Sequence, residues 1–421
     1  MSKKFLKRIN YFFLYSFIFI LCLGNLQRIQ LPNNLAFYIH DVIIAAWLSF
    51  TTLTQPRWLI LLKLQISSFK HQRLLVIFLI TQLLTYSITL ISGISLLIPL
   101  LYLARLNFYA LFAYQLYYLS HSLILNPKSL NFSALSFGFF LLVFGFLQYA
   151  FLPDTRFLSV YGWDDHYYRL VSTLLDPNFT GIILVLTFLN LQAIKPQSFN
   201  HSVMKSSGFL FFILNLSFLI GILLTYSRAS YLSFLVGLTS LTALKLKSLT
   251  IKPFSPSAIN IILSFSLWIL VLGSGILVLP HPGGEGTNLL RTSSIEARQT
   301  SASQSLSVLA PHQLLIGQGL FVTSKTNPIL DSFNPDFIPN HSTQPVSSWL
   351  AIFLGTGAIG SSLIIILFWK LVKSLYQKKS FLLLSLLLAL LTHSIFNATL
   401  TYPFVVLLMG ILIAEANQQL T

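Results

Sequence analysis

Charged residues are scarce in this sequence. Only 9% of its 421 residues are Asp, Glu, Lys or Arg, whereas 55% are hydrophobic. A soluble domain usually carries about a quarter charged residues. A chain with so few charges cannot cover its surface for water, but it can present apolar side chains to lipid. The composition therefore excludes an ordinary soluble domain and predicts an all-α integral membrane protein.

Cysteine is almost absent. Cys22 is the only one, and it lies inside the first apolar run. This excludes a disulfide within the chain and a multi-cysteine metal site. The N-terminal SKKFLKRIN followed by YFFLYSFIFILCLG has the pattern of a signal peptide, but no small-x-small cleavage site follows. We therefore expect this run to remain as the first membrane span.

Long apolar runs dominate the rest of the chain. A run must cover about 30 Å of hydrocarbon to cross a bilayer as a helix. Twelve runs are long enough, near residues 11–27, 36–54, 74–92, 95–119, 132–152, 178–194, 207–225, 229–246, 259–280, 347–369, 380–396 and 400–417. We predict about twelve transmembrane helices, with residues 1–421 forming a single polytopic membrane domain.

Acidic residues are missing from one set of loops. If the runs cross alternately, the termini and loops on one side hold 18 of the 26 Lys and Arg and no Asp or Glu. These are four residues before the first run, four after the second, one after the fourth, two after the sixth, three after the eighth and four after the tenth. The positive-inside rule places that side, and both termini, in the cytoplasm of a cell (plasma or inner) membrane. It also explains the net charge of +16 without a nucleic-acid partner.

Two segments on the opposite side are longer than a connection needs. Residues 153–177 are rich in aromatic and charged residues, and residues 281–346 form a 66-residue stretch of Gly, Ser, Thr, Asn and Pro. Loops of this length in a compact protein are usually functional or disordered. We expect a smaller extracytoplasmic loop and a large one, the latter carrying short helices.

Four arginines fall on this predicted outer side. They are Arg169 in YYRLVSTLLDPNFTG, Arg228 in LLTYSRASYLSFL, and Arg291 and Arg298 in NLLRTSSIEARQTSASQSL. Guanidinium binds phosphate oxygens bidentately and stays charged at any physiological pH. The set predicts a phosphate-binding site. Each arginine alone could equally anchor the protein at the membrane surface or pair with a nearby acidic residue.

A helix is expected around the last two arginines. Asn288 can cap its start, and Pro311 would end it. The spacing of seven between Arg291 and Arg298 would place both guanidiniums on one face of that helix.

Two charges lie inside apolar runs. Asp41 is in AFYIHDVIIAAW and Arg105 is in LLYLARLNFYALF. Exposing either charge to lipid costs roughly 3 kcal/mol or more, so both should face the bundle interior. They can pair with each other, which gives them a structural or a functional role.

His341, in NPDFIPNHSTQPVSSWL, is the candidate general base. The pKa of histidine lies near neutrality, so it could accept the proton of a sugar hydroxyl. A loop histidine can also simply be solvated. Asp164, Asp165 and His166 are adjacent in the chain, and adjacent side chains diverge rather than form a cage. We therefore expect no metal site and no cofactor.

One group of glycines precedes His341 in the chain, and another follows it. Gly355, Gly357 and Gly360 in LGTGAIGSS would permit close helix packing. Gly317 and Gly319 in LLIGQGLF would permit a tight turn.

In the order of these landmarks, the chain resembles the O-antigen ligase and O-antigen polymerase superfamily. DPNFTG at 176–181 looks like the family's Pro-Asn entry to a central helix, and TYSRASYLSFLVG at 225–237 looks like its Ser-Arg signature. LLIGQGLF looks like the Gly-x-Gly turn that ends the family's long loop. QPVSSWLAIFLGTGAIG at 344–360 looks like its closing segment. The resemblance covers roughly residues 165–365.

The chain departs from the family in one place. The closing segment of the family usually carries His-Asn about ten residues before the first glycine of the helix. The corresponding positions here are near Val346, Ser347 and Ser348, and His341 lies five or six residues earlier.

The resemblance implies a membrane glycosyltransferase that acts in cell-surface polysaccharide biosynthesis. Its donor would be a glycan linked to polyprenyl (undecaprenyl) diphosphate, and its acceptor a sugar hydroxyl on another glycan or on a lipid-linked glycan. It covers both polymerases, which extend one lipid-linked chain with another, and ligases, which transfer glycan to lipid or protein. Arg228 and His341 would be catalytic, and Arg169, Arg228, Arg291 and Arg298 would hold the diphosphate. A transporter or flippase for a polyprenyl-linked or anionic solute is the alternative, and a structural scaffold is a third.

Overall fold

A computed structural model describes most of the chain. It covers residues 2–31, 36–67, 72–91, 96–192, 201–248, 256–280, 284–307, 309–322 and 347–416, with single residues at 93 and 282. Apart from a short antiparallel hairpin, β1 (Arg28–Gln30) with β2 (Ala36–Tyr38), the regular structure is helical. The prediction of an all-α protein is confirmed at this level.

The described α-helices follow the predicted runs closely. They are α1 (Lys3–Cys22), α2 (Ile39–Thr54), α3 (Arg57–Ser67), α4 (Gln72–Ile91), α5 (Leu97–His121), α6 (Pro127–Phe151), α7 (Pro177–Leu191), α8 (His201–Leu224), α9 (Arg228–Ser248), α10 (Pro256–Val278), α11 (Ser293–Ser307), α12 (Pro311–Ile316), α14 (Ser348–Gln377), α15 (Phe381–Phe396) and α16 (Pro403–Ala416). Each apolar run falls on one of them. Six helices are long and apolar enough to cross a membrane by length and composition (α1, α5, α6, α9, α10 and α14), and six more are apolar but shorter. One helix, α3, occupies a stretch that we expected to be a loop.

Helix α7 is the centre of the bundle. Asp176 caps its start by accepting hydrogen bonds from the backbone N–H groups of Asn178 and Phe179, and Pro177 supplies the first helical residue. Every residue from Thr180 to Leu191 is buried. A helix that is apolar on all sides must be covered on all sides, and α6, α8, α9 and α15 pack around it.

The outer helices expose large apolar side chains. Phe12 of α1, Leu83 of α4, Leu270 of α10 and Trp369 of α14 are each 69% exposed. Exposed apolar area of this extent, spread over several helices, suits contact with lipid chains. The protein is therefore built as a membrane-embedded helical bundle.

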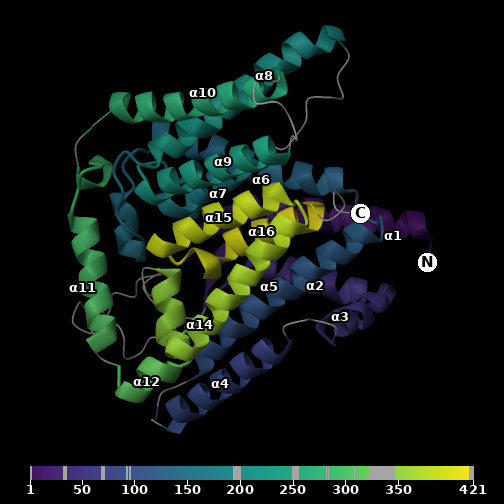
Figure 1. The fold of residues 1–421 in the computed structure, drawn as a ribbon, viewed down its shortest axis with the longest axis vertical. Coiled ribbons are helices and arrows are strands. Elements are labelled where there is room, and N and C mark those ends of the chain that lie inside the picture. The colour runs from purple at the N-terminus through teal and green to yellow at the C-terminus, as the bar shows by residue number, and fades with distance from the viewer. Residues whose placement is uncertain are drawn as a thin grey trace.

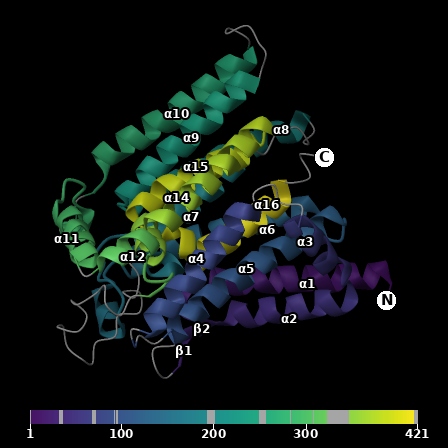
Figure 2. The same ribbon diagram turned by 60° about the horizontal axis from the view of Figure 1, so that its bottom comes forward.

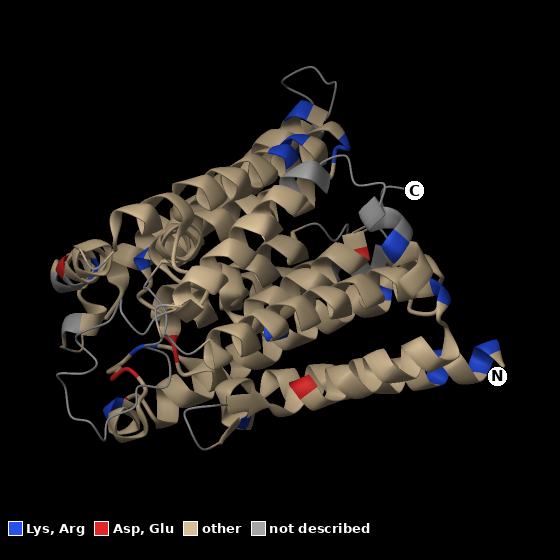
Figure 3. Cartoon of the chain, turned by 90° about the horizontal axis from the view of Figure 1, so that it is seen from below, with Lys and Arg blue, Asp and Glu red and all other residues tan. Residues whose placement is uncertain are grey.

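The two ends of the bundle differ in charge. The first residues of α1 and the last of α16 lie toward the same end (Figure 1). Lys and Arg gather at that end, and most Asp and Glu lie toward the other (Figure 3). Helices α1 and α2 pack side by side along one edge, and the β1–β2 hairpin lies at the end away from the N-terminus (Figure 2).

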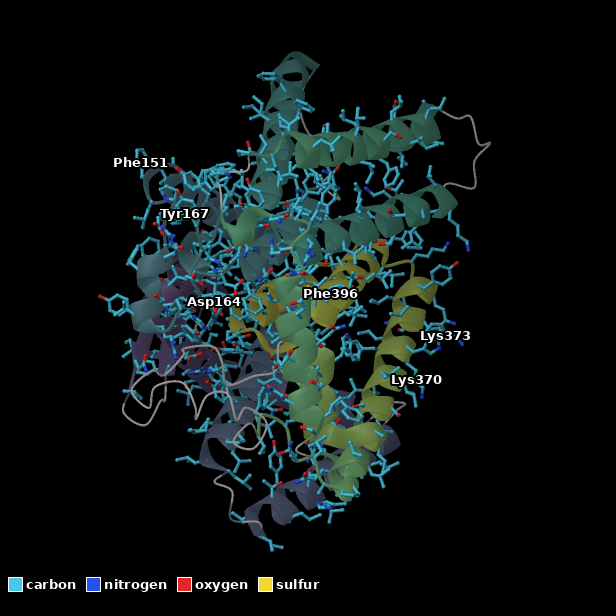
Figure 4. The ribbon with its side chains drawn as sticks, turned by 90° about the vertical axis from the view of Figure 1, so that its left-hand side faces the viewer. Phe151, Asp164, Tyr167, Lys370, Lys373 and Phe396 are labelled. Carbon is cyan, nitrogen blue, oxygen red and sulfur yellow. The ribbon has the colours of Figure 1, made fainter. Side chains whose placement is uncertain are left out.

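Helix α11 crosses the end opposite the N-terminus (Figures 1 and 4). It begins later than expected, because the carbonyl of Thr292 accepts the first helical hydrogen bonds, from Ile295 and Glu296. Arg291 therefore precedes the helix, and the prediction that it shares a helical face with Arg298 is wrong.

The predicted ends of that helix are also wrong. Asn288 caps only a turn, in which its side chain accepts a hydrogen bond from the N–H of Leu290. Pro311 begins α12 instead of ending α11, which stops at Ser307. Asn288 and Pro311 each begin a turn or a helix, as their side chains favour, but neither bounds α11.

Helix α14 is interrupted at Gly357, whose backbone adopts φ 61° and ψ −169°. The interruption leaves carbonyl groups without helical partners, and those of Leu354 and Gly355 accept hydrogen bonds from the N–H groups of Gln318 and Gly319, both at 2.9 Å. Gly357 does permit close packing, as predicted, since a Cβ there would overlap the backbone of Leu315, but it also ends one helical segment and starts another. The LLIGQGLF segment docks into this break.

The predicted tight turn at Gly317 and Gly319 is confirmed. Both have a positive φ, 82° and 102°. A Cβ at Gly317 would also overlap the backbone of Gly355, so this close approach of two chain segments requires glycine.

Candidate functional site

The structure brings the four predicted arginines together at the end of the bundle that α11 crosses. Arg169 precedes the short 3-10 helix η3 (Ser172–Leu174), Arg228 is the first residue of α9, Arg291 lies between η4 (Glu285–Thr287) and α11, and Arg298 is in α11. We call these four residues the arginine cluster. Three separate parts of the chain contribute to it, and hydrogen bonds between these parts position Arg169, Arg228 and Arg291.

Arg169 is the most deeply placed member, with only 6% of its surface exposed. Its Nε donates a hydrogen bond to the carbonyl of Thr225 at 3.0 Å, and its Cδ lies against Gly286. The buried Nη2 has no hydrogen-bond partner within the described chain. A guanidinium nitrogen left open in a buried place is a donor available to a ligand.

Burial and the charge of Arg291 lower the pKa of Arg169 to about 10. The guanidinium is therefore still protonated at neutral pH. Its burial without a carboxylate partner is unfavourable, and a bound anion would relieve that cost.

Arg228 ties the start of α9 to the segment before α11. Its Nη1 donates to the carbonyls of Leu289 at 3.3 Å and Arg291 at 3.0 Å, and its Nη2 donates to the Ser294 hydroxyl at 2.7 Å. The acceptors are neutral, so they hold the guanidinium in place without cancelling its charge.

Arg291 in turn donates hydrogen bonds within its own loop and back to the α8–α9 connection. Its Nη1 donates to the carbonyls of Gly286 at 2.7 Å and Asn288 at 2.9 Å, and its Nη2 donates to the carbonyl of Tyr226 at 3.5 Å. Arg228 and Arg291 thus hold each other's backbone segments. These hydrogen bonds tie the segment before α11 to the α8–α9 connection.

Arg298 reaches the same place from α11. Burial lowers its pKa, the charge of Arg228 lowers it further, and Asp176 at the start of α7 opposes the shift. Within the described chain, no ion pair involves Arg169, Arg228 or Arg298. The cluster therefore concentrates positive charge, which favours an anionic ligand.

A buried polar network lies beside the cluster, and sequence reasoning missed it. Asn178 accepts a hydrogen bond from the Ser227 hydroxyl at 2.9 Å, and Ser227 accepts one from Ser230 at 3.0 Å. Ser230 contacts the Nε2 of His393 at 3.4 Å, and the Nδ1 of His393 lies 2.7 Å from the Thr399 hydroxyl. The network joins the starts of α7 and α9 to the end of α15.

The signal for this network was present in the sequence. LTHSIFN at 391–397 places a histidine, a serine and an asparagine at the end of an apolar run. Buried polar side chains in an apolar bundle need partners, so such a cluster indicates contacts with other helices. His393 has no exposed surface, and its role in this structure is to connect helices.

The predicted pairing of Asp41 and Arg105 is confirmed. The Nη2 of Arg105 lies 3.2 Å from the Oδ2 of Asp41. Asp41 also accepts hydrogen bonds from the N–H of Tyr38 at 3.0 Å and the hydroxyl of Tyr109 at 2.6 Å. The pair joins the first turn of α2 to α5, so its position supports a structural role.

The remaining predicted residues do not form a second site. His341 lies outside the described residues. Asp164 and Asp165 are exposed, whereas the carbonyl of buried His166 accepts hydrogen bonds from Thr155. Across the described part of the chain, His, Cys, Asp and Glu form no group of three that could hold a metal ion. Figure 4 shows Asp164 and Tyr167 on the opposite side of α11 from Lys370 and Lys373 in that view.

Comparison with known proteins identifies no relative of this chain. No model of a known protein family matches this chain, and a search of curated proteins finds no match either. The structure itself defines the class, an all-α protein with helices long and apolar enough to cross a membrane.

Proposed function

We propose that this protein is an integral-membrane glycosyltransferase of the O-antigen ligase or polymerase type. It would transfer or polymerise glycan from a polyprenyl-diphosphate donor onto a sugar hydroxyl during the synthesis of cell-surface polysaccharide. The observation that carries the proposal is the arginine cluster, in which three chain segments place four guanidiniums at one end of a membrane-type bundle.

The chemistry of glycosyl transfer fits this cluster. When the anomeric C–O bond breaks, its electron pair stays on the diphosphate oxygen, and the acceptor oxygen forms the new bond as its proton leaves to a base. Negative charge grows on the diphosphate during this step. Fixed guanidiniums that are partly shielded from water stabilise such charge in the transition state, and they do so without a metal ion.

The members of the cluster would divide this work. Arg169 offers its open Nη2 to a phosphate oxygen, and Arg298 approaches from α11. Arg228 and Arg291 hold the loop to the bundle and supply charge from fixed positions. A site that is rigid before the donor binds loses less free energy on reorganising in the transition state.

His341 remains the proposed base, although it lies five or six residues earlier than the histidine of the family and outside the described residues. The segment that carries it re-enters the described structure at Ser347. The next residue, Ser348, donates two hydrogen bonds to the carbonyl of Asn397, from its N–H at 3.1 Å and its hydroxyl at 2.9 Å. That anchor lies beside the His393 network, which adjoins the arginine cluster.

The proposal includes a topology. The protein would cross the membrane twelve times, with both termini in the cytoplasm and residues 153–177 and 281–346 outside. The gathering of Lys and Arg at the end that holds the N-terminus supports this orientation (Figure 3). Donor, acceptor and arginine cluster would then meet at the extracytoplasmic surface.

Replacement of Arg228 with Ala tests the function. The variant should still enter the membrane, and lipid-linked glycan should accumulate, because transfer loses about 100-fold or more in rate when one charge-stabilising group is removed. Arg156→Ala is the matched control, since Arg156 is exposed and pairs only with Asp154 among described carboxylates. Normal glycan transfer by the Arg228 variant would count against the proposal.

One observation favours the second candidate, a transporter. Transporters often contain helices broken within the membrane, and α14 is broken at Gly357. Here, however, Gln318 and Gly319 already occupy the freed carbonyls, so the break does not offer them to a solute. Reconstituted vesicles separate the two functions, because solute movement without a new glycosidic bond would identify a transporter.

A further inference from the structure

A cavity of about 140 Å³ lies among η1 (Gly24–Gln27), the β1–β2 hairpin, α5, the start of α7 and the segment that leads into α16. An apolar cavity of about 150 Å³ is large enough to hold a benzene ring. The cavity therefore has room for one six-membered ring. Its walls combine aromatic rings, guanidinium groups and an amide, and none of the charged side chains in the lining is acidic.

Aromatic rings form flat walls. Phe179 and Tyr402 stack with their ring centres 3.7 Å apart and their planes 3° from parallel. Tyr102 stacks on Phe321 at 5.8 Å, and the Trp163 ring also lines the cavity. A pyranose has C–H groups on its faces and hydroxyls around its rim. Its faces can pack on such rings while its rim bonds to polar groups.

Polar groups also line the cavity. The Asn25 side chain is held by Tyr38, whose hydroxyl donates to its Oδ1 at 3.2 Å, and Asn25 in turn donates to the Tyr402 hydroxyl at 3.2 Å and to the carbonyl of Leu174. Asn25, Tyr38 and Tyr402 all line the cavity. Both amide hydrogens of Asn25 are used within the protein, so the set offers a sugar the Tyr402 hydroxyl proton and acceptor oxygens in fixed positions.

The charge in the cavity is not balanced. Arg105 is paired with Asp41 at 3.2 Å, but Arg28 makes no ion pair within the described chain. The Arg28 guanidinium lies over the Trp163 ring, 5.7 Å from its centre. This contact holds the positive charge against an aromatic wall of the cavity without neutralising it.

The cavity shares its walls with the arginine cluster. Phe179 lines the cavity, and the preceding residue, Asn178, contacts Ser227 next to Arg228. On the other side, Ala398 and Thr401 line the cavity and flank Thr399, the partner of His393. A ring in the cavity would therefore lie beside the place where the diphosphate would sit.

We propose that this cavity binds a single sugar ring that carries an anionic group, with Arg28 binding the anion and the aromatic walls packing on the ring. The ring would belong to the acceptor glycan. That acceptor role rests on the proposed function, whereas sugar binding by the cavity does not.

Direct titration tests the binding. Glucuronate, glucose 6-phosphate and glucose are added separately to the purified full-length protein in detergent, and dissociation constants are measured by ligand-observed NMR. At least one anionic sugar should bind about tenfold more tightly than glucose, because a hydrogen bond between charged partners is stronger than one between neutral groups. The tighter of the two identifies the anion as a carboxylate or a phosphate.

Two variants locate the site. Arg28→Gln should remove the preference for the anionic sugar and leave glucose binding unchanged, and Trp163→Ala should weaken all three sugars. Arg156→Gln, which removes an exposed charge at the same end of the molecule, is the control. Thermal melts of each variant establish that it is folded.

Several outcomes would overturn the proposal. They are no binding by the wild-type protein, equal binding of the three sugars, an Arg28 variant that keeps the preference, or a Trp163 variant that binds normally. A different result, normal glycan transfer by the Arg228→Ala variant, would contradict the proposed glycosyltransferase function. If the glycosyltransferase function holds, Arg28→Gln should raise KM for the acceptor much more than it changes kcat.

Discussion

The guanidinium of Arg228 donates a hydrogen bond of 3.0 Å to the backbone carbonyl of Arg291, 63 positions further along the chain. Through this contact the first turn of α9 holds the segment that leads into α11. Arg291 returns the contact by donating to the carbonyl of Tyr226. The positions of the two charges are thus coupled, which leads to the first prediction.

Replacement of Arg228 with Lys should loosen the segment before α11. A lysine keeps the charge but is a point donor, so it cannot reach Leu289, Arg291 and Ser294 together. We expect faster hydrogen exchange in residues 288–294 and a loss of stability of about 1–3 kcal/mol. Ser294→Ala, which removes only one of the three acceptors, should show a smaller effect. Identical exchange in the lysine variant and the wild type would contradict this account.

Anion binding at the cluster should depend on pH through Arg169. Burial lowers its pKa to about 10 in the folded protein, below the ordinary value of an arginine, so between these two values the unfolded chain holds more protons and stability rises with pH. Below pH 10 the Arg169 guanidinium is charged in both the folded and the unfolded protein, so folding carries the full cost of burying this charge. Pyrophosphate affinity should therefore fall as pH rises through about 10.

Arg169→Lys provides the control for that titration. The ordinary pKa of lysine is about 10.4, lower than that of arginine, so the same burial would move the loss of affinity to a lower pH. Binding is followed by calorimetry between pH 7 and 10.5. A pyrophosphate affinity that stays constant over this range in both proteins would exclude Arg169 as a ligand-binding group.

Gly357→Ala should destabilise the protein by about 1–3 kcal/mol, the usual cost of an unfavourable backbone conformation. Gly357 has a φ of 61°, and a Cβ there would overlap the carbonyl of Leu315. Gly273→Ala in α10 is the matched control, because a Cβ at Gly273 meets no atom within 4 Å. Thermal unfolding in detergent should therefore separate the two variants, with a lower midpoint only for Gly357→Ala.

The Asp41–Arg105 pair should stabilise the packing of α2 on α5. A double-mutant cycle with Asp41→Asn and Arg105→Gln measures the interaction without assigning it to either residue. At a separation of 3.2 Å we expect a coupling of about 0.5–3 kcal/mol. Additive effects of the two substitutions on unfolding would show that the pair contributes nothing measurable.

Much of the fold could be predicted from local signals. The apolar runs marked the helices. The run near 178–194 marked α7, whose start Asp176 and Pro177 determine locally, because a capping carboxylate and an N1 proline act within one turn. The Asp41–Arg105 pairing followed from the cost of exposing either charge to lipid. These inferences needed no knowledge of how distant segments meet.

The candidate site could be predicted only in part. Its arginines were recognised by residue type and by the side of the membrane on which their loops should fall. Arg291 was placed on a helix because Asn288 was expected to cap its start and Pro311 to end it. Asn288 instead begins a turn and Pro311 begins α12, and the sequence does not distinguish these uses of the two residues. Arg28 and His393 were missed because each acquires its neighbours from segments far away in the chain.

The sequence by itself determined that the chain forms apolar helices, where most of them begin, and that its basic residues separate from its acidic ones. These properties depend on hydrophobicity, capping and charge, which act over a few residues. Only the tertiary structure decided that α14 breaks at Gly357, that Arg228 and Arg291 hold each other's segments, and that a cavity opens beside Arg28. Each of these depends on contacts between residues far apart in the chain, whose geometry is fixed only when the whole bundle packs.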